Sequence, residues 1–254
     1  MKKRALLSLL EENEGLARQL GQELAKAGLD VQAHFWNPDL AKMAWGQAAR
    51  ELAECQVWVI AGADFSAKDT RIGLSLTALS ARAEHGGGLP ILISPASGGL
   101  DAASLPEALR NAEIVKSGLG VKAAVRANTA KPGPTGEYRL KPYALNELGL
   151  WFEIGPGRDP WQGAFFACGG SEKAVPNAHG VGQAGAIPER CTLRWPVQGM
   201  KLAIRGTDCE GWGVKNELTP ATSYYVRVGA CPEVLAFGAF PDTDEAEAYT
   251  VSLV

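Results

Sequence analysis

The sequence Val57-Trp-Val-Ile-Ala61 is a run of five apolar residues that contains the aromatic and β-branched types favoured in strands. A continuous apolar run of this length is typical of a strand that is buried on both faces of a sheet. Apolar residues at helical spacing occupy Ala41 to Glu54 before it and Arg71 to Ala83 after it. A buried strand between two helices indicates a parallel α/β sheet.

The same alternation extends toward both ends of this half of the chain. Further strands are predicted at Ala5 to Leu10, Val31 to Trp36 and Pro90 to Ser94. A helix that ends at Gly28 is predicted between the first two strands, and a last helix is predicted from Asp101 to Val115. Four strands separated by helices predict one parallel sheet with helices on both faces, the three-layer arrangement of flavodoxin-like domains.

The second half of the chain has a different character, because glycines and prolines separate short segments rich in aromatic and β-branched residues. Strands are predicted at Val121 to Arg126, Tyr138 to Leu140, Leu148 to Ile154, Ala164 to Cys168, Cys191 to Trp195, Lys201 to Arg205, Ser223 to Val228, Val234 to Phe240 and Ala248 to Leu253. Such spacing predicts an antiparallel β-sandwich or barrel-like domain. We therefore expect an α/β domain at residues 1–117 and a β-rich domain at residues 118–254. Thr129 to Gly136 is the best candidate for the linker, and a boundary about ten residues earlier is the alternative.

Two features of the second half are compatible with either a role in binding a partner or a purely structural role. The glycine-rich stretch Gly169 to Pro188 has almost no apolar periodicity and is predicted to be a long loop, either a binding loop or a flexible excursion. Trp161, Trp195 and Trp212 lie among glycines and prolines. They fit an aromatic binding surface or packing in the core.

The composition excludes several classes of partner. The chain carries 25 Lys and Arg against 28 Asp and Glu, with a pI near 5.7, so neither nucleic acid nor a membrane is expected as a partner. No stretch approaches the roughly 20 apolar residues of a membrane helix. The five cysteines are odd in number and form no CxxC pair, which favours reduced thiols in the cytoplasm.

Motifs for metal binding and catalysis are missing from the sequence. The histidines, His34, His85 and His179, are far apart, and no cysteine has a zinc-like spacing. Neither a GxSxG elbow nor a triad signature occurs. Gly180 to Gly185 satisfies GxGxxG, but no helix is predicted after it, as a dinucleotide fingerprint requires. We therefore expect no metal and no cofactor, and the sequence favours a non-enzymatic role.

Polar residues follow two of the predicted strands at their carboxyl ends, the edge at which open α/β sheets bind ligands. The candidate ligand-binding residues are Glu11, Glu12 and Asn13 after the first strand, and Asp64, Ser66 and Asp69 after the strand at Val57. Because Ser, Asp and Asn also cap helix N-termini, a ligand site and helix capping remain alternatives.

The order of elements over residues 4 to 112 carries a family resemblance. A short strand, an acidic turn, a helix, the strand at Val31 to Trp36 and the helix at Ala41 to Glu54 lead into Cys55-Gln-Val-Trp-Val-Ile-Ala-Gly62. This order resembles a Toll/interleukin-1 receptor (TIR) domain, in which Val57 to Ile60 and Pro90 to Ile93 occupy the positions of apolar strands. The resemblance implies a self-associating signalling module.

Some TIR domains are enzymes that cleave NAD, and the resemblance also bears on this activity. The enzymatic members carry a glutamate in the helix after the strand that matches Val57 to Ala61. The corresponding segment here, Arg71 to Ala83, contains no acidic residue. NAD cleavage is therefore not expected.

The sequence as a whole favours an intracellular sensor or interaction protein. Its α/β half is expected to form a homo-oligomer or to bind a small nucleotide-like ligand, and its β-rich half to supply a second recognition surface. The alternative is a nucleotide- or flavin-dependent enzyme that acts at the edge marked by Glu12 and Asp64.

Overall fold

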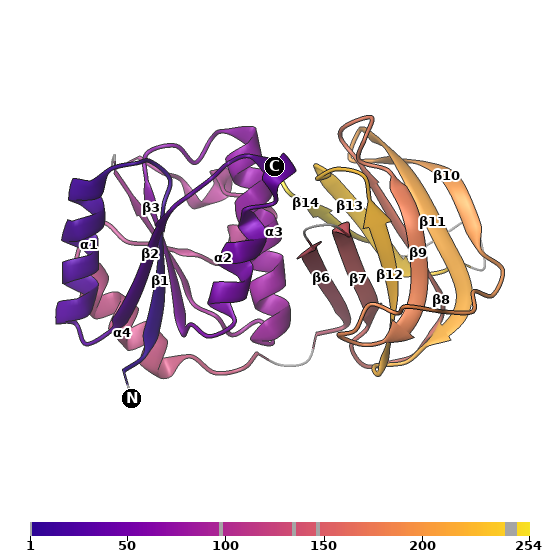
Figure 1. Cartoon of the computed structure of the whole chain (residues 1–254), viewed down its shortest axis with the longest axis horizontal. Coiled ribbons are helices and arrows are strands. Elements are labelled where there is room, and N and C mark those ends of the chain that lie inside the picture. Colours follow the sequence, from indigo (N-terminus) through magenta and orange to yellow (C-terminus); the bar gives the residue numbers. More distant parts are fainter. Residues whose placement is uncertain (1, 97–98, 134–135, 146–147, 242–247) are drawn as a thin grey trace. The chain divides into compact units, whose positions relative to one another are not determined.

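The computed structural model describes residues 2–96, 99–133, 136–145, 148–241 and 248–254, which belong to two compact units, Met1–Pro134 and Thr135–Val254. The first unit is an α/β domain and the second is rich in β-strands, as Figure 1 shows. The predicted fold class is therefore confirmed.

The first unit contains a parallel sheet of five strands in the order β2-β1-β3-β4-β5. The strands are β1 (Arg4–Leu9), β2 (Asp30–Phe35), β3 (Val57–Gly62), β4 (Ile91–Pro95) and β5 (Glu113–Ile114). This is the strand order of flavodoxin-like domains. All six residues of β3 are buried, which agrees with its apolar sequence and its central position.

Helices cover both faces of this sheet (Figure 1). The helices are α1 (Glu14–Lys26), α2 (Trp45–Leu52), α3 (Lys68–Glu84) and α4 (Leu119–Thr129). On one face, Leu24 of α1 and Ala123 of α4 share a buried cluster with Val59 of β3. On the other face, Trp36 after β2 lies against Gly73 of α3, where an added Cβ atom would come within 2.9 Å of the indole ring. The three layers follow from this two-sided burial.

Two predicted elements of the first half are wrong. The expected helix from Asp101 to Val115 is replaced by two short 3-10 helices and strand β5, because Leu105 and Pro106 are extended and interrupt the helical turns. The expected strand from Val121 to Arg126 is helix α4, whose Leu119, Ala123 and Ala127 are buried one turn apart. Since α4 belongs to the first unit, the boundary lies after residue 134, inside the linker candidate Thr129 to Gly136, and not after residue 117.

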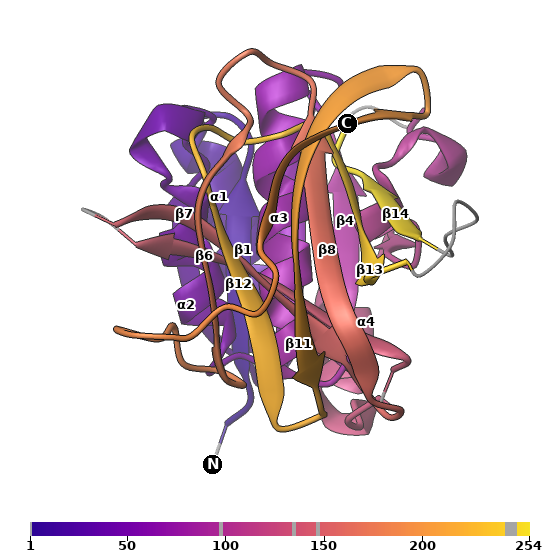
Figure 2. The ribbon, with the colours of Figure 1, turned by 90° about the vertical axis from the view of Figure 1, so that its right-hand side faces the viewer.

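The second unit consists of two antiparallel sheets, with strand orders β10-β11-β8-β13-β14 and β6-β7-β12-β9 (Figure 2). The strands are β6 (Tyr138–Leu145), β7 (Gly149–Pro156), β8 (Trp161–Gly169), β9 (Pro176–Gln183), β10 (Val197–Ile204), β11 (Thr207–Leu218), β12 (Thr222–Val228), β13 (Val234–Ala239) and β14 (Tyr249–Ser252). Aromatic rings join the two sheets, since Phe152 of β7 stacks on Phe166 of β8 with ring centroids 5.1 Å apart. The unit is therefore a β-sandwich.

The sequence misjudged three segments of this unit. The stretch Gly169 to Pro188, which is expected to be a loop, contains strand β9 (Pro176–Gln183). Strand β11 is not predicted from the sequence. Cys191 to Trp195, expected to be a strand, has no regular structure. Glycines explain the missed strand β11, because Gly211 and Gly213 leave room for Ala167 and Phe240 and so remove the apolar alternation from the sequence.

The chain leaves the first unit through a close backbone crossing. After α4, residues Lys131–Gly133 pass over the turn Gly86–Gly88 that joins α3 to β4. A Cβ atom on Gly88 would overlap with the carbonyl oxygen of Lys131, and one on Gly133 would overlap with the carbonyl oxygen of Gly86. The crossing therefore requires glycine on both segments.

The central strand gives a test of the fold. Trp58 of β3 is 0% exposed, and its indole N–H donates to the Ser8 hydroxyl at 2.9 Å. We expect Trp58→Ala to lower the free energy of unfolding by about 3–5 kcal/mol, measured by urea denaturation. The control Trp195→Ala, at a side chain that is 77% exposed, is expected to change it by less than about 0.5 kcal/mol. A loss of less than about 1 kcal/mol for Trp58→Ala would contradict the central role of β3.

Candidate functional site

The predicted ligand residues lie at the carboxyl edge of the parallel sheet. Glu11, Glu12 and Asn13 follow β1, and Asp64 and Ser66 follow β3, which is the neighbour of β1. Asp69 lies in the first turn of α3. This edge, between β1 and β3, is the switch point at which flavodoxin-like domains bind their ligands.

The loops at this switch point are packed against each other. The Leu10 N–H donates to the Ala61 carbonyl at 2.8 Å, so the chain after β1 is held to the end of β3. Gly62 has a φ of 142°, and an added Cβ atom would lie 2.8 Å from the Cβ atom of Leu10. The Leu10 side chain therefore lies where the two loops would have to separate to admit a ligand.

One of the candidate residues caps a helix, and two others shape the loop before the next helix. Asn13 Oδ1 accepts from the Leu16 N–H at 2.9 Å and caps α1. Asp64 Oδ1 accepts from the Ser66 hydroxyl at 2.8 Å, from the Ser66 N–H at 2.9 Å and from the Ala67 N–H at 3.1 Å, within the loop before α3, whose N-cap residue is Ala67. These hydrogen bonds, first among them that of the Ser66 hydroxyl, hold the pKa of Asp64 below its usual value. The capping alternative therefore accounts for Asn13, whereas Asp64 and Ser66 form a local turn in the loop.

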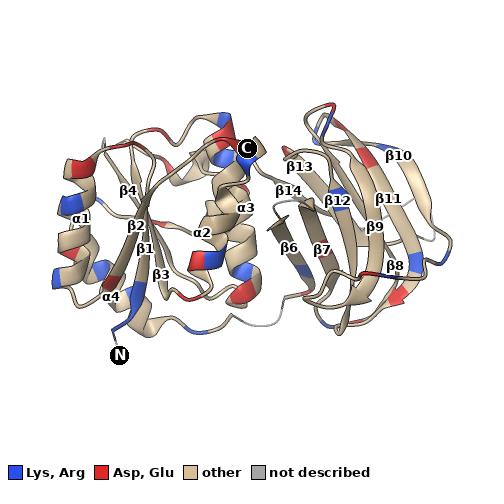
Figure 3. Cartoon of the chain, viewed as in Figure 1, with Lys and Arg blue, Asp and Glu red and all other residues tan. Residues whose placement is uncertain are grey.

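The remaining carboxylates make this edge unfavourable for phosphate. Glu11 and Glu12 are exposed before α1, and Asp69 lies in the first turn of α3. Figure 3 shows acidic residues in red at the start of α1. A phosphate at a helix N-terminus needs a positive potential, and these nearby negative charges would repel it.

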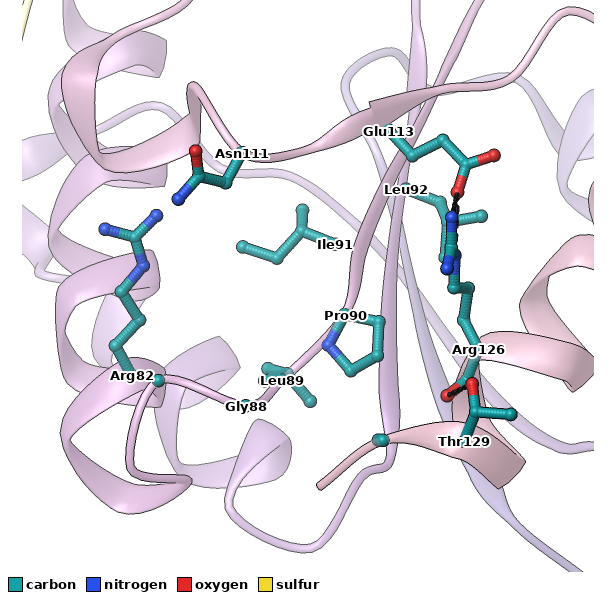
Figure 4. Close-up of a pocket in the computed structure, with 12 residues that line it drawn as sticks. Arg82, Gly88, Leu89, Pro90, Ile91, Leu92, Asn111, Glu113, Arg126 and Thr129 are labelled. Atoms are coloured by element: carbon teal, nitrogen blue, oxygen red, sulfur yellow. Dashed lines mark hydrogen bonds and ion pairs between the residues drawn. The ribbon is translucent and has the colours of Figure 1, made fainter. Parts of the chain in front are cut away.

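A hollow lies at the opposite edge of the same sheet, near the start of β4 (Figure 4). It has a volume of about 420 Å³. Leu89, Pro90 and Ile91 line it between two polar walls, with Arg82 and Asn111 on one side and Glu113 and Arg126 on the other. Sequence reasoning missed this site, because its residues come from segments that are distant along the chain.

An ion-pair cluster forms one wall of this hollow. Glu113 accepts from Arg126 Nε at 2.8 Å and lies 3.3 Å from Lys122 Nζ. The hydrogen bond from Arg126 is the main reason why the pKa of Glu113 is lowered, and Lys122 adds to it. Two cations therefore surround one carboxylate.

The three histidines are used separately within the two units. His34 Nε2 lies 2.6 Å from the Ser8 hydroxyl, His85 Nε2 lies 2.8 Å from the Leu52 carbonyl, and His179 Nδ1 lies 2.7 Å from the Tyr224 hydroxyl. Burial lowers the pKa of His34 and of His179. Among the residues that the structure describes, no group of three or more His, Cys, Asp or Glu side chains is arranged to hold a metal ion.

The tryptophans of the sandwich do not form one surface. Trp161 of β8 is buried and lies 6.5 Å from Tyr249 between ring centroids, whereas Trp212 of β11 packs edge-on against His179 at 4.9 Å. Trp195 is exposed. Two of the three therefore pack within the unit.

A buried charged cluster in the second unit was not predicted. Glu153 of β7 is fully buried, accepts from the Ser223 hydroxyl at 2.6 Å and from the Gly185 N–H at 2.9 Å, and lies 2.9 Å from Arg139 Nε. Tyr143 donates to its second carboxylate oxygen. Burial opposes ionisation of Glu153, but these hydrogen bonds and Arg139 outweigh it and lower the pKa. Every partner donates to the carboxylate, so its oxygen atoms are satisfied although they are buried. The hydrogen bond from the Gly185 N–H also holds the segment at Gly185 onto the sheet.

Comparison with known proteins adds little to what the geometry of these sites shows. No protein-family model matches the sequence, and curated proteins give no match. Among solved structures, the chain is similar to a 3-dehydroquinate dehydratase-like protein from Bifidobacterium longum, with 17% sequence identity and a TM-score of 0.33. The match covers 50% of this chain and 94% of that chain. A likeness at this TM-score gives no information on activity or ligands. Across the described residues, no helix is long and apolar enough to cross a membrane.

The structural role of Asp64 in the loop before α3 can be tested by mutation. We expect Asp64→Ala to lower the free energy of unfolding by about 1 kcal/mol, because the Ser66 and Ala67 N–H groups lose their acceptor. Urea denaturation at neutral pH measures this loss. Glu12→Ala is the control and should change stability by less than about 0.5 kcal/mol. Equal losses for the two variants would contradict this role of Asp64.

The Glu153 cluster predicts a stability that depends on pH. Glu153→Gln is expected to cost about 3 kcal/mol at neutral pH, because the charge of Arg139 loses its partner. The pKa of Glu153 is lower in the folded state than in the unfolded chain, so its contribution is present above the unfolded pKa and is lost as the pH falls through the folded pKa.

Urea denaturation between neutral and acidic pH should therefore show the difference between wild type and Glu153→Gln shrinking in acid. Glu172→Gln, at an exposed residue of the same unit, is the matched control. A difference that stays constant with pH would show that ionised Glu153 does not stabilise the fold.

Proposed function

We propose that this protein is a sensor or interaction protein without catalytic activity of its own. Its α/β unit associates with a second copy or binds a small ligand, and its β-sandwich supplies a second recognition surface. A cytoplasmic location fits the five free cysteines, of which Cys55, Cys168 and Cys209 are buried.

The observation that carries this proposal is the use of polar residues at the switch point. Asn13 caps α1, Asp64 holds the loop before α3, and Leu10 packs against Gly62 between the two loops. An enzyme would need an acid, a base or a nucleophile that converges on an open cleft. Asn13, Asp64 and Ser66 support the local structure of this edge instead.

Self-association is the function that a TIR-like domain would provide, and we propose it for the first unit. The strand order β2-β1-β3-β4-β5 is compatible with that resemblance, although other flavodoxin-like domains share it. Sedimentation velocity of the full chain over a range of concentrations tests the proposed self-association. A mass that rises with concentration supports self-association, and a monomer at all concentrations leaves ligand binding as the function of the unit.

The alternative is an enzyme that uses a nucleotide or a flavin at the carboxyl edge. The flavodoxin-like strand order favours it, because domains of this order bind flavin at the switch point between β1 and β3. Absorbance of the purified protein at flavin wavelengths, with mass spectrometry of released small molecules, tests it. A stoichiometric bound flavin or nucleotide would replace our proposal by this alternative.

We predict that the protein does not cleave NAD. Breaking the nicotinamide bond develops positive charge on the ribose, and a nearby carboxylate normally stabilises that charge. In α3, Asp69 lies in the first turn and Glu84 is the last residue, and the buried polar residues between them include Ser75 and Thr77 but no carboxylate. Nicotinamide release is expected to equal that of a buffer blank. Steady release that disappears in Glu84→Ala or Glu12→Ala would contradict this prediction.

A further inference from the structure

The hollow at the start of β4 exists because the edge strand β5 is short. β5 pairs only with Leu92 and Ile93 of β4. The residues just before this pairing, Leu89 to Ile91, therefore extend past the end of the edge strand. α3 and α4 end on either side of this space and close it into the hollow of about 420 Å³ (Figure 4). This volume falls in the usual range for sites that bind small molecules.

Two arginines and one glutamate line this space. Arg82 lies in the last turn of α3 and Arg126 in the last turn of α4, and both line the hollow. Glu113 supplies one negative charge, which is balanced by Arg126 and Lys122 together. Arginine in a last turn also stabilises helix carbonyl groups, but the guanidinium of Arg82 points along its side of the hollow toward Asn111 (Figure 4).

The surface between the charged walls is apolar. Leu89 and Ile91 are each 8% exposed, and Pro90 lies between them in the chain and is half-buried. A guanidinium beside an apolar floor matches a ligand that has a planar anionic group on an apolar body, because arginine binds carboxylates through two parallel hydrogen bonds. The Asn111 amide offers both a donor and an acceptor at the same wall.

We propose that this hollow binds a small organic acid, with its carboxylate at Arg82 and Asn111 and its apolar body on Leu89 to Ile91. The site is separate from the carboxyl edge and extends the proposed function by naming a ligand class. The hollow is also lined by Thr129 and Ala130, directly before the segment Lys131–Gly133 that leads to the second unit. A bound acid therefore contacts the chain just before that crossing.

The experiment is an NMR titration of the full chain with three probes. Benzoate carries the carboxylate and an apolar ring, benzamide has the same ring without the charge, and inorganic phosphate has the charge without the ring. Benzoate is expected to shift the amide signals of Gly87, Gly88, Asn111 and Thr129 with one dissociation constant. Benzamide and phosphate are each expected to bind at least about tenfold more weakly.

Variants separate the site from a general effect of charge. Arg82→Gln is expected to weaken benzoate binding about tenfold, whereas Arg110→Gln, at an exposed residue of the same unit outside the hollow, leaves it unchanged. Asn111→Ala is a second test that keeps the Arg82 contacts, and it should weaken binding by a smaller factor. Thermal unfolding of each variant verifies that it is folded.

The results that overturn the proposal are distinct from those that overturn the proposed function. Absence of shifts with benzoate, equal affinity for benzoate and benzamide, equal affinity for phosphate, or unchanged binding by both Arg82→Gln and Asn111→Ala each overturns the organic-acid site. Shifts at Glu12 and Asp64 instead of the hollow would place the ligand at the carboxyl edge. Self-association is measured separately by sedimentation and is unaffected by these outcomes.

Discussion

Burial of β3 on both faces is the constraint on which the first unit depends. A strand whose six residues are all shielded from water needs a neighbouring strand on each side and a helical layer above and below. β1 and β4 supply the neighbours, and the two pairs of helices supply the layers. The burial includes the polar N–H of the Trp58 indole, which donates to the buried hydroxyl of Ser8 in the neighbouring strand β1 instead of to water. The positions of the sheet edges, and so of both candidate sites, follow from this central strand.

The two edges of the sheet then differ in what they offer to a ligand. At the carboxyl edge, Asn13 caps α1, Asp64 holds the loop before α3, and Leu10 lies against Gly62. At the opposite edge, the short strand β5 leaves space beside Leu89 to Ile91, and arginines from two helix ends face it. Helix N-termini usually make the carboxyl edge the attractive one for anions. Here carboxylates surround those N-termini, and positive charge is found at the other edge.

The sequence alone predicts the strands and helices whose apolar residues form a recognisable pattern. The strands at Ala5, Val31, Val57 and Pro90 and the helices between them were predicted, because two-sided burial leaves continuous apolar runs in the sequence. Strand β9 was missed because its residues are small and polar and it is stabilised by pairing with β12, a contact that no local pattern records. α4 was mistaken for a strand because it is short and contains the β-branched residues Val121 and Val125, which are exposed on the helix.

The candidate sites, like the fold, could be predicted from the sequence only in part. Sequence order correctly placed Glu11 to Asn13 and Asp64 to Ser66 at one edge, because residues that follow adjacent parallel strands must lie there. It did not separate capping from ligand binding, since the same oxygen atoms serve both purposes. The hollow at β4 was beyond prediction from sequence because Arg82, Asn111 and Arg126 meet only after the sheet has formed.

The glycine crossing of Gly88 and Lys131 has a consequence for how a partner would be held. The chain is fixed to the first unit as far as Gly133, and β6 of the second unit begins at Tyr138, so only a few residues link the two. If each unit carries a recognition surface, as we propose, a short link would hold the two surfaces at an effective concentration of the order of millimolar. A partner with one contact on each unit would therefore bind with an avidity far above the affinity of either contact. Lengthening the chain between Gly133 and Tyr138 would reduce that avidity without changing a single contacting residue.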